Sequence, residues 1–120
     1  MNPVDCKPLG ETICGRLASE IRQLGFSEGN PVSLPAYDQA GFSTAKDPYT
    51  GSDSLLGHWK NQQGYRVGEI TFHGDGSFYA EYDVVLQHPT DARWFVESVV
   101  AWGRDGLIKS EAKLLPSLGQ

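Results

Sequence analysis

The sequence predicts an α+β fold, in which an N-terminal amphipathic helix (about 9–24) packs on an antiparallel β-meander of about four to five strands (about 55–115). Three observations support this. Apolar residues recur at helical spacing near the N-terminus. From Tyr65 onward the apolar period changes to two, as in a half-buried strand. Between these runs stand glycine-containing turn sequences.

The predicted helix has one apolar stripe and polar residues off it. Pro8 suits a first helical turn, where a missing N–H is tolerated, and Gly25 suits the left-handed residue that ends a helix. Such a helix needs a partner surface, because an isolated helix of this length is marginal in water. The stripe consists of Leu9, Ile13, Leu17, Ile21 and Leu24.

Residues 27–54 are interpreted as a long irregular loop. Pro31, Pro35 and Pro48 interrupt the segment, and neither the helical nor the strand period persists through it. Apolar residues such as Leu34 and Phe42 nevertheless make it too hydrophobic for a linker. We therefore expect it to wrap the domain, with a short strand or helical turn inside it.

The C-terminal strands have one apolar and one acidic face. In residues 78–86 the apolar side chains alternate with Glu81 and Asp83. In the next run one predicted face carries Trp94, Val96, Ser98, Val100 and Trp102, and the other carries Phe95, Glu97, Val99 and Ala101. In the last run Ile108, Ser110, Ala112 and Leu114 oppose Lys109, Glu111 and Lys113.

Turn chemistry predicts the strand registers. Gly74-Asp75-Gly76 suits a three-residue loop that places Phe72 opposite Phe78. For the last hairpin a four-residue loop, 103–106, competes with a five-residue loop, 103–107. We favour the five-residue loop, because it sets Trp102 opposite Ile108 and brings Glu97 beside Lys113.

Composition limits the classes of function. The chain has 120 residues and a formal net charge of −5, which indicates one domain (1–120) without the basic stripe that nucleic acids require. No apolar run is long enough to predict a membrane span, and no signal peptide is visible, so we expect a cytoplasmic protein. Cys6 and Cys14 lack histidines at ligand spacing, so no metal site or cofactor is predicted.

The acidic face is the first candidate site. The predicted register puts Glu69 opposite Glu81 and Asp83 near Glu97, with His73 on the same side. One interpretation is a site for a cation, or for a carboxylic acid or histidine that transfers protons. The other, which we favour, is a face whose charges are simply solvated.

The aromatic residues Trp59, Tyr82 and Trp102 form the second candidate site. They could line a pocket for a small ligand between sheet and helix, or they could fill the core. The function we expect is that of a small non-catalytic binding or interaction domain; the alternative is a small enzyme that uses the acidic-face carboxylates or His73. A protein partner or homodimer could cover apolar residues of the acidic face, namely Phe95, Val99 and Val85.

Overall fold

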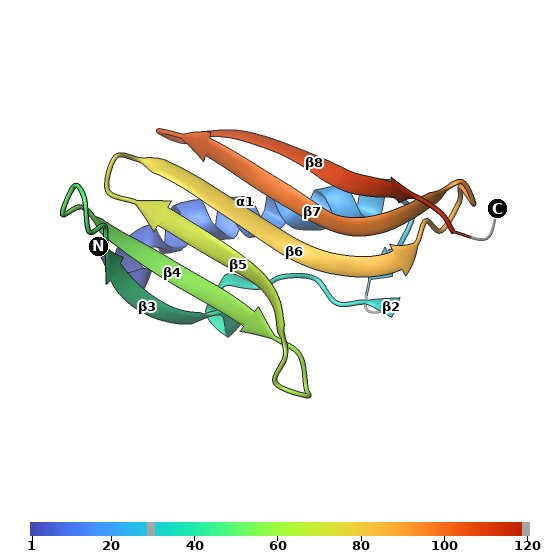
Figure 1. The fold of residues 1–120 in the computed structure, drawn as a ribbon, viewed down its shortest axis with the longest axis horizontal. Helices are drawn as coiled ribbons and strands as arrows, with labels where there is room; N and C mark the ends of the chain where they lie inside the picture. The colour runs from blue at the N-terminus through green and yellow to red at the C-terminus, as the bar shows by residue number, and fades with distance from the viewer. Residues whose placement is uncertain (29–30, 119–120) are drawn as a thin grey trace.

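The computed structural model describes residues 1–28 and 31–118 and has an α+β architecture (Figure 1). Among these residues the main sheet has six antiparallel strands in the order β3-β4-β5-β6-β7-β8, where four to five were expected. β1 and β2 form a separate short parallel pair. In chain order the elements are α1 (Pro3–Gln23), β1 (Ser27–Glu28), β2 (Pro31–Val32), the 3-10 helix η1 (Tyr37–Gln39), β3 (Gly41–Lys46), β4 (Asp53–Lys60), β5 (Arg66–His73), β6 (Ser77–Gln87), β7 (Trp94–Arg104) and β8 (Leu107–Pro116).

The helix begins at Pro3 rather than near residue 9. Asn2 is the N-cap, and its side-chain oxygen accepts a hydrogen bond from the backbone N–H of Asp5 at 2.9 Å. Pro8 therefore lies inside the helix and not in its first turn. Ile13, Leu17 and Ile21 of the predicted stripe are buried, whereas Leu9 and Leu24 are partly buried. Gly25 has the positive φ of +107° expected of a residue that follows a helix.

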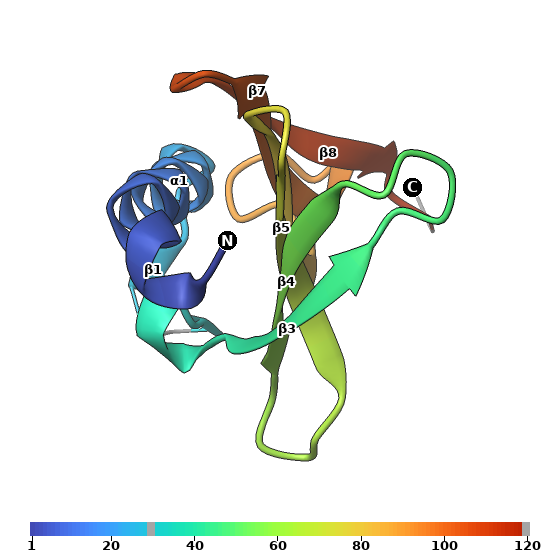
Figure 2. The ribbon, with the colours of Figure 1, turned by 90° about the vertical axis from the view of Figure 1, so that its left-hand side faces the viewer.

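Helix α1 covers one face of the sheet, mainly over β7 and β8 (Figure 2). Residues 33–40 cover the neighbouring part of the same face. Trp59 Nε1 of β4 donates a hydrogen bond to the carbonyl of Ala36 at 2.8 Å, and the hydroxyls of Tyr82 and Ser33 lie 3.0 Å apart. These bonds fix the segment to the strands beneath it.

The prediction of one long irregular loop over residues 27–54 is wrong in part, because that range contains β1, β2, η1 and β3. Strand β3 was not predicted because it shows no alternation of apolar and polar residues: it is an edge strand whose side chains are mostly exposed. Its one large apolar residue, Phe42, contacts the ring of Tyr37 with a centroid separation of 4.9 Å. A single apolar side chain cannot reveal a period.

The first predicted turn is confirmed. Phe72 pairs with Phe78 across β5 and β6, and Ile70 pairs with Ala80. Gly76 has a φ of +88°, which a side chain would disfavour. The side chains of Ile70 and Ala80 therefore face the helix together, as the alternation required.

The predicted last turn is wrong. β7 and β8 are joined by a two-residue turn, Asp105–Gly106, in which both residues have positive φ. This geometry is the commonest tight hairpin turn, and Asp-Gly is its usual sequence. As a result Trp102 lies opposite Lys109, not opposite Ile108.

A bulge changes the face on which the residues of β7 lie. Val84 and Val85 of β6 stand against the single residue Glu97 of β7, and the register with β8 also shifts between Val96 and Ser98. Val96 and Val99 therefore both face the helix and are fully buried. This corrects the predicted faces: Val99 lies under α1 rather than on the acidic face, and Ser98, Val100 and Trp102 lie on the acidic side.

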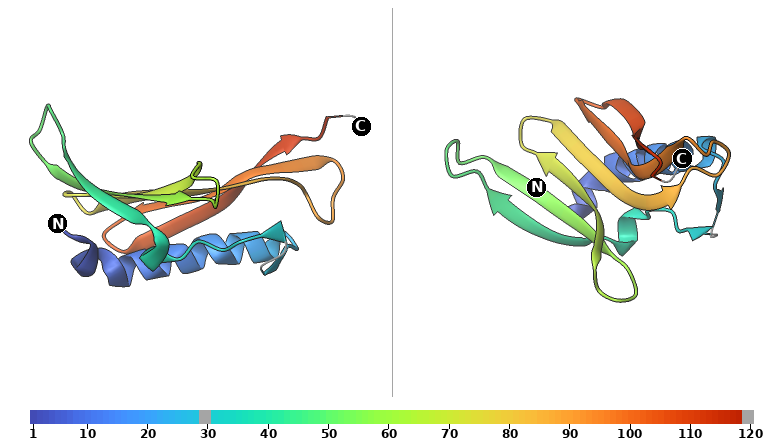
Figure 3. Two further views of the ribbon diagram at one scale, coloured as in Figure 1. Left: turned by 90° about the horizontal axis from the view of Figure 1, so that it is seen from below. Right: turned by 45° about the vertical axis from the view of Figure 1, so that its right-hand side comes forward.

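The second sheet face, which we call the outer face, is not covered by any described element. Figure 3 shows the β3–β4 loop and the C-terminal end of β8 on the opposite side of the sheet from α1. The outer face lies between these two ends. By the strand registers it carries Ser54, Leu56, His58, Glu69, Thr71, His73, Tyr79, Glu81, Asp83, Ser98, Val100, Trp102, Lys109, Glu111 and Lys113.

Candidate binding face of the sheet

A row of ionisable residues crosses the middle of the outer face. His58 of β4 lies opposite Glu69 of β5, and Glu69 lies opposite Glu81 of β6. All three side chains are half-buried. The pairing of the two glutamates is the one predicted from the three-residue turn, whereas His58 was not recognised as a member of the row. Directly opposed like charges are unfavourable on a sheet.

Glu81 has the polar partners that offset part of this repulsion. The hydroxyl of Ser98 donates a hydrogen bond to Glu81 Oε1 at 3.3 Å, and Lys113 Nζ lies 3.8 Å from the same oxygen. Lys113 therefore reaches from β8 across β7 to β6. Beneath these side chains Ser98 and Val100 are only 1% and 2% exposed, although no described element packs over them.

Asp83 completes the acidic group with Glu97. Partial burial of Asp83, together with the negative charges of Glu81, Glu97 and Glu69, raises the pKa of its carboxyl above the usual value. Asp83 lies opposite Ser98, and Glu97 occupies the neighbouring bulge. The structure thus brings together the four carboxylates that the sequence placed on one face.

A hollow of about 220 Å³ lies at this group and is the place where the outer face could receive a side chain. Gly68 lines the hollow with its backbone only, because a Cβ at this position would point toward the buried rings of Tyr82 and Trp59 on the inner face. Among the described residues no cluster of histidine, cysteine and carboxylate side chains has the arrangement of a metal site. The hollow is lined by Arg66, Gly68, Glu69, Glu81 and Asp83.

His73 lies apart from the acidic group, at the end of β5. Its Nδ1 is 3.0 Å from the hydroxyl of Ser54, and both groups are accessible to water. Asp47 and Asp75 lie near His73, but the described hydrogen bonds of their carboxylates go to other partners. Asp47 accepts hydrogen bonds from backbone amides of its own turn. Asp75 accepts hydrogen bonds from Ser77 and forms an ion pair with Arg104. The serine–histidine contact therefore lacks the bonded carboxylate that orients a catalytic base.

The three aromatic residues of the second candidate site do not line one pocket. Trp59 and Tyr82 contact each other edge to face in the core, with ring centroids 5.7 Å apart. Their polar atoms are used to hold residues 33–36. Trp102 lies on the outer face instead, between Tyr79 and Lys109.

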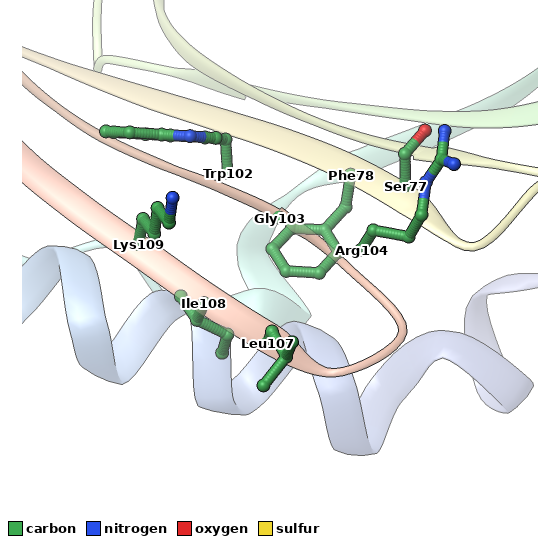
Figure 4. Close-up of a pocket in the computed structure, with 8 residues that line it drawn as sticks. All are labelled: Ser77, Phe78, Trp102, Gly103, Arg104, Leu107, Ile108 and Lys109. Carbon is green, nitrogen blue, oxygen red and sulfur yellow. The ribbon is translucent and has the colours of Figure 1, made fainter.

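A larger hollow of about 690 Å³ lies at the β7–β8 hairpin end of the sheet (Figure 4). Trp102 and Lys109 stand on one side of the hairpin, and Phe78 and Ile108 on the other. This hollow was not predicted, because the expected five-residue turn included Gly103, which lies in β7. The Asp-Gly dipeptide was the signal that could have placed the turn correctly. The lining residues are Ser77, Phe78, Trp102, Gly103, Arg104, Leu107, Ile108 and Lys109.

Comparison with known proteins finds no family model, no curated protein and no solved structure that matches this chain. No helix in the described part of the chain is both long enough and apolar enough to cross a membrane. The function must therefore be argued from the geometry of the outer face.

Proposed function

We propose that this domain is a non-catalytic binding module that holds a protein partner on its outer face. The observation that carries the proposal is the asymmetry of the sheet. One face is sealed by α1 and residues 33–40, while the described residues leave the other face open. On this open face Glu69 lies directly opposite Glu81, and the repulsion between the two carboxylates is unfavourable for folding.

The chemistry of the outer face favours a partner with basic and apolar side chains. A lysine or arginine of the partner in the 220 Å³ hollow would meet Glu69, Glu81 and Asp83 and would relieve their mutual repulsion. The half-buried side chain of Leu56, on the same face, offers apolar contact. The partner would thus gain charge complementarity at the centre and an apolar contact on the same face.

A cytoplasmic location is part of this proposal. Cys6 and Cys14 are both free thiols, and Cys14 is buried in the hydrophobic core. Burial raises the pKa of the Cys14 thiol to about 12, which keeps it protonated and unreactive. Free cysteines are typical of proteins in reducing compartments.

Binding can be measured with two synthetic peptides of equal length. Both alternate leucine with a charged residue, which is lysine in one peptide and glutamate in the other. We expect the lysine peptide to bind more tightly, by fluorescence anisotropy at fixed ionic strength. The double variant Glu69→Gln, Glu81→Gln should weaken its binding several-fold, whereas Glu11→Gln, on the exposed side of α1, should leave it unchanged.

Two results would overturn the proposal. One is equal affinity for the lysine and glutamate peptides, which would mean that the carboxylates do not contribute. The other is unchanged affinity of the Glu69→Gln, Glu81→Gln variant, which would place the binding surface elsewhere.

A further inference from the structure

Strand β8 forms an edge of the main sheet whose second side has no partner within the described residues. It runs over 10 residues, Leu107–Pro116, without a glycine or an internal proline. Long regular edge strands pair readily with other strands, and most proteins interrupt them with bulges, prolines or short lengths. β8 has no bulge, and no proline before its last residue, so charged side chains on the outer face, Lys109, Glu111 and Lys113, are its protection against pairing.

The backbone of β8 directs alternate residues toward its open side. Arg104 and Leu107 flank the two-residue turn and are therefore a hydrogen-bonded pair. At the other end the backbone N–H of Ser117 donates to the carbonyl of Arg93 at 2.9 Å, so the odd-numbered residues bond toward the body of the sheet. The even-numbered residues Ile108, Ser110 and Ala112 consequently present their N–H and C=O groups to the open side.

The charges of β8 complement those of a second, antiparallel copy of itself. Lys109, Glu111 and Lys113 alternate in sign on the outer face. When Ser110 pairs with Ser110 of a second copy, each Lys109 lies opposite a Glu111, and this contact occurs twice. We propose that two copies of this chain pair through β8 in this register and form one continuous sheet with a two-fold axis at Ser110.

Two competing registers are less favourable. Pairing Glu111 with itself opposes two carboxylates and also sets Lys109 against Lys113. Pairing Ala112 with itself opposes Glu111 to Lys113, but it also places Ile108 opposite Pro116, which has no N–H to donate. Of the three registers, the one centred on Ser110 forms the charge pairs while every outward residue that it pairs has an N–H to donate.

Apolar side chains along the edge also favour a second copy. Ile108, Ala112 and Leu114 are only partly buried beneath α1, and Leu107 is 78% exposed. The hydroxyl of Ser110 donates to Glu20 Oε1 of α1 at 3.3 Å, which holds the helix over the inner face and leaves the strand edge open. In the dimer both helices lie on the same side, and the two outer faces become continuous.

The test combines sedimentation velocity with residue-specific hydrogen exchange. The wild-type chain should sediment as a concentration-dependent dimer. Glu111→Lys should weaken the dimer about tenfold, because two attractive pairs become repulsive. The double variant Lys109→Glu, Glu111→Lys should restore it, because the charge pairs reform with reversed sign. A monomer at every concentration, or a dimer unaffected by Glu111→Lys, overturns the proposal, and failure of the rescue overturns the register.

Hydrogen exchange distinguishes this dimer from one formed through the outer face. The amides of Ile108, Ser110 and Ala112 should exchange rapidly in the monomer and become protected as the dimer forms. The amides of Lys109 and Glu111 should be protected in both states. Dimerisation without new protection at the even-numbered residues contradicts pairing through β8. The inference does not depend on the proposed partner binding, because the residues that pair lie on β8 and the carboxylates of the hollow lie on β5 and β6.

Discussion

Glu69 of β5 and Glu81 of β6 are direct cross-strand partners on the outer face of the sheet. Lys113 and Ser98 offset the charge of Glu81, whereas the described residues give Glu69 no ion pair. The pair therefore costs folding free energy in the isolated domain. Such a cost is expected where a surface is adapted to a partner rather than to solvent.

We predict that Glu69→Gln stabilises the isolated domain while it weakens binding of the lysine peptide. Removal of the repulsion should raise the free energy of unfolding by about 0.2–1 kcal/mol. The control is Glu111→Gln, which faces Val100 instead of another carboxylate and should change stability less. Urea denaturation at neutral pH and low salt measures both. A destabilised Glu69→Gln variant would contradict the assigned repulsion.

The pH dependence of stability should differ in sign between two aspartates. The folded state raises the pKa of Asp83 above 3.8, so this carboxyl favours folding most when protonated, and its contribution falls as pH rises through the raised pKa. Asp83→Asn should therefore become more stable relative to wild type between about pH 3 and pH 7. Denaturant titrations across this range measure the difference.

Asp91 supplies the opposite case. Its hydrogen bonds to Arg93 lower the pKa of Asp91 to about 2, so the ionised carboxylate favours folding. This contribution is present above the ordinary value of 3.8 and is lost as pH falls toward about 2. Asp91→Asn should thus be destabilised at pH 7 and should approach wild type in acid. Parallel pH curves for the Asp83→Asn and Asp91→Asn variants would show that at least one of the two assignments is wrong.

Two glycines of α1 should respond to alanine with opposite signs. A Cβ at Gly10 would overlap the ring of Tyr37, whereas a Cβ at Gly15 would meet no atom within 4 Å. We predict that Gly10→Ala lowers the free energy of unfolding by about 1–3 kcal/mol through overpacking. Gly15→Ala should raise it by about 0.5–1 kcal/mol, because alanine is the better helix former. Guanidinium denaturation of the two variants tests the packing of Tyr37 on the helix.

Val85 is a strained position in the β6 bulge. Its φ is +53°, a region that β-branched residues rarely adopt, and its side chain is 60% exposed. Val85→Asn should therefore raise the free energy of unfolding by about 1 kcal/mol, because asparagine tolerates this conformation. Val84→Asn is the matched control and should be destabilising, since Val84 is buried. Loss of stability in Val85→Asn would show that this bulge is formed differently.

The helix and the β5–β6 hairpin could be predicted from sequence because each depends on a local signal. The stripe through Ile13 and Leu17 has helical spacing, and Gly74-Asp75-Gly76 sets the register that opposes Glu69 to Glu81. The start of α1 also had a local signal, the Asn2-Pro3 cap, which the apolar stripe did not include.

The remaining features depend on contacts between distant residues. In Val84-Val85 the sequence cannot show which valine is inserted, yet the bulge decides that Val99 faces the helix. Gly103 looks like a turn residue but lies in β7, where a Cβ would overlap the backbone oxygen of Leu107. The contact of Lys113 with Glu81 spans β7, so it depends both on the bulge between β6 and β7 and on the position of the turn between β7 and β8.

The most direct test of a functional outer face is to map the lysine peptide on the ¹⁵N-labelled domain by NMR. We predict saturable chemical-shift changes centred on Glu69, Glu81 and Ser98, with the amides of Ile13 and Leu17 in α1 unchanged. Changes centred on α1, or no saturable change at peptide concentrations that suppress non-specific binding, would contradict the account.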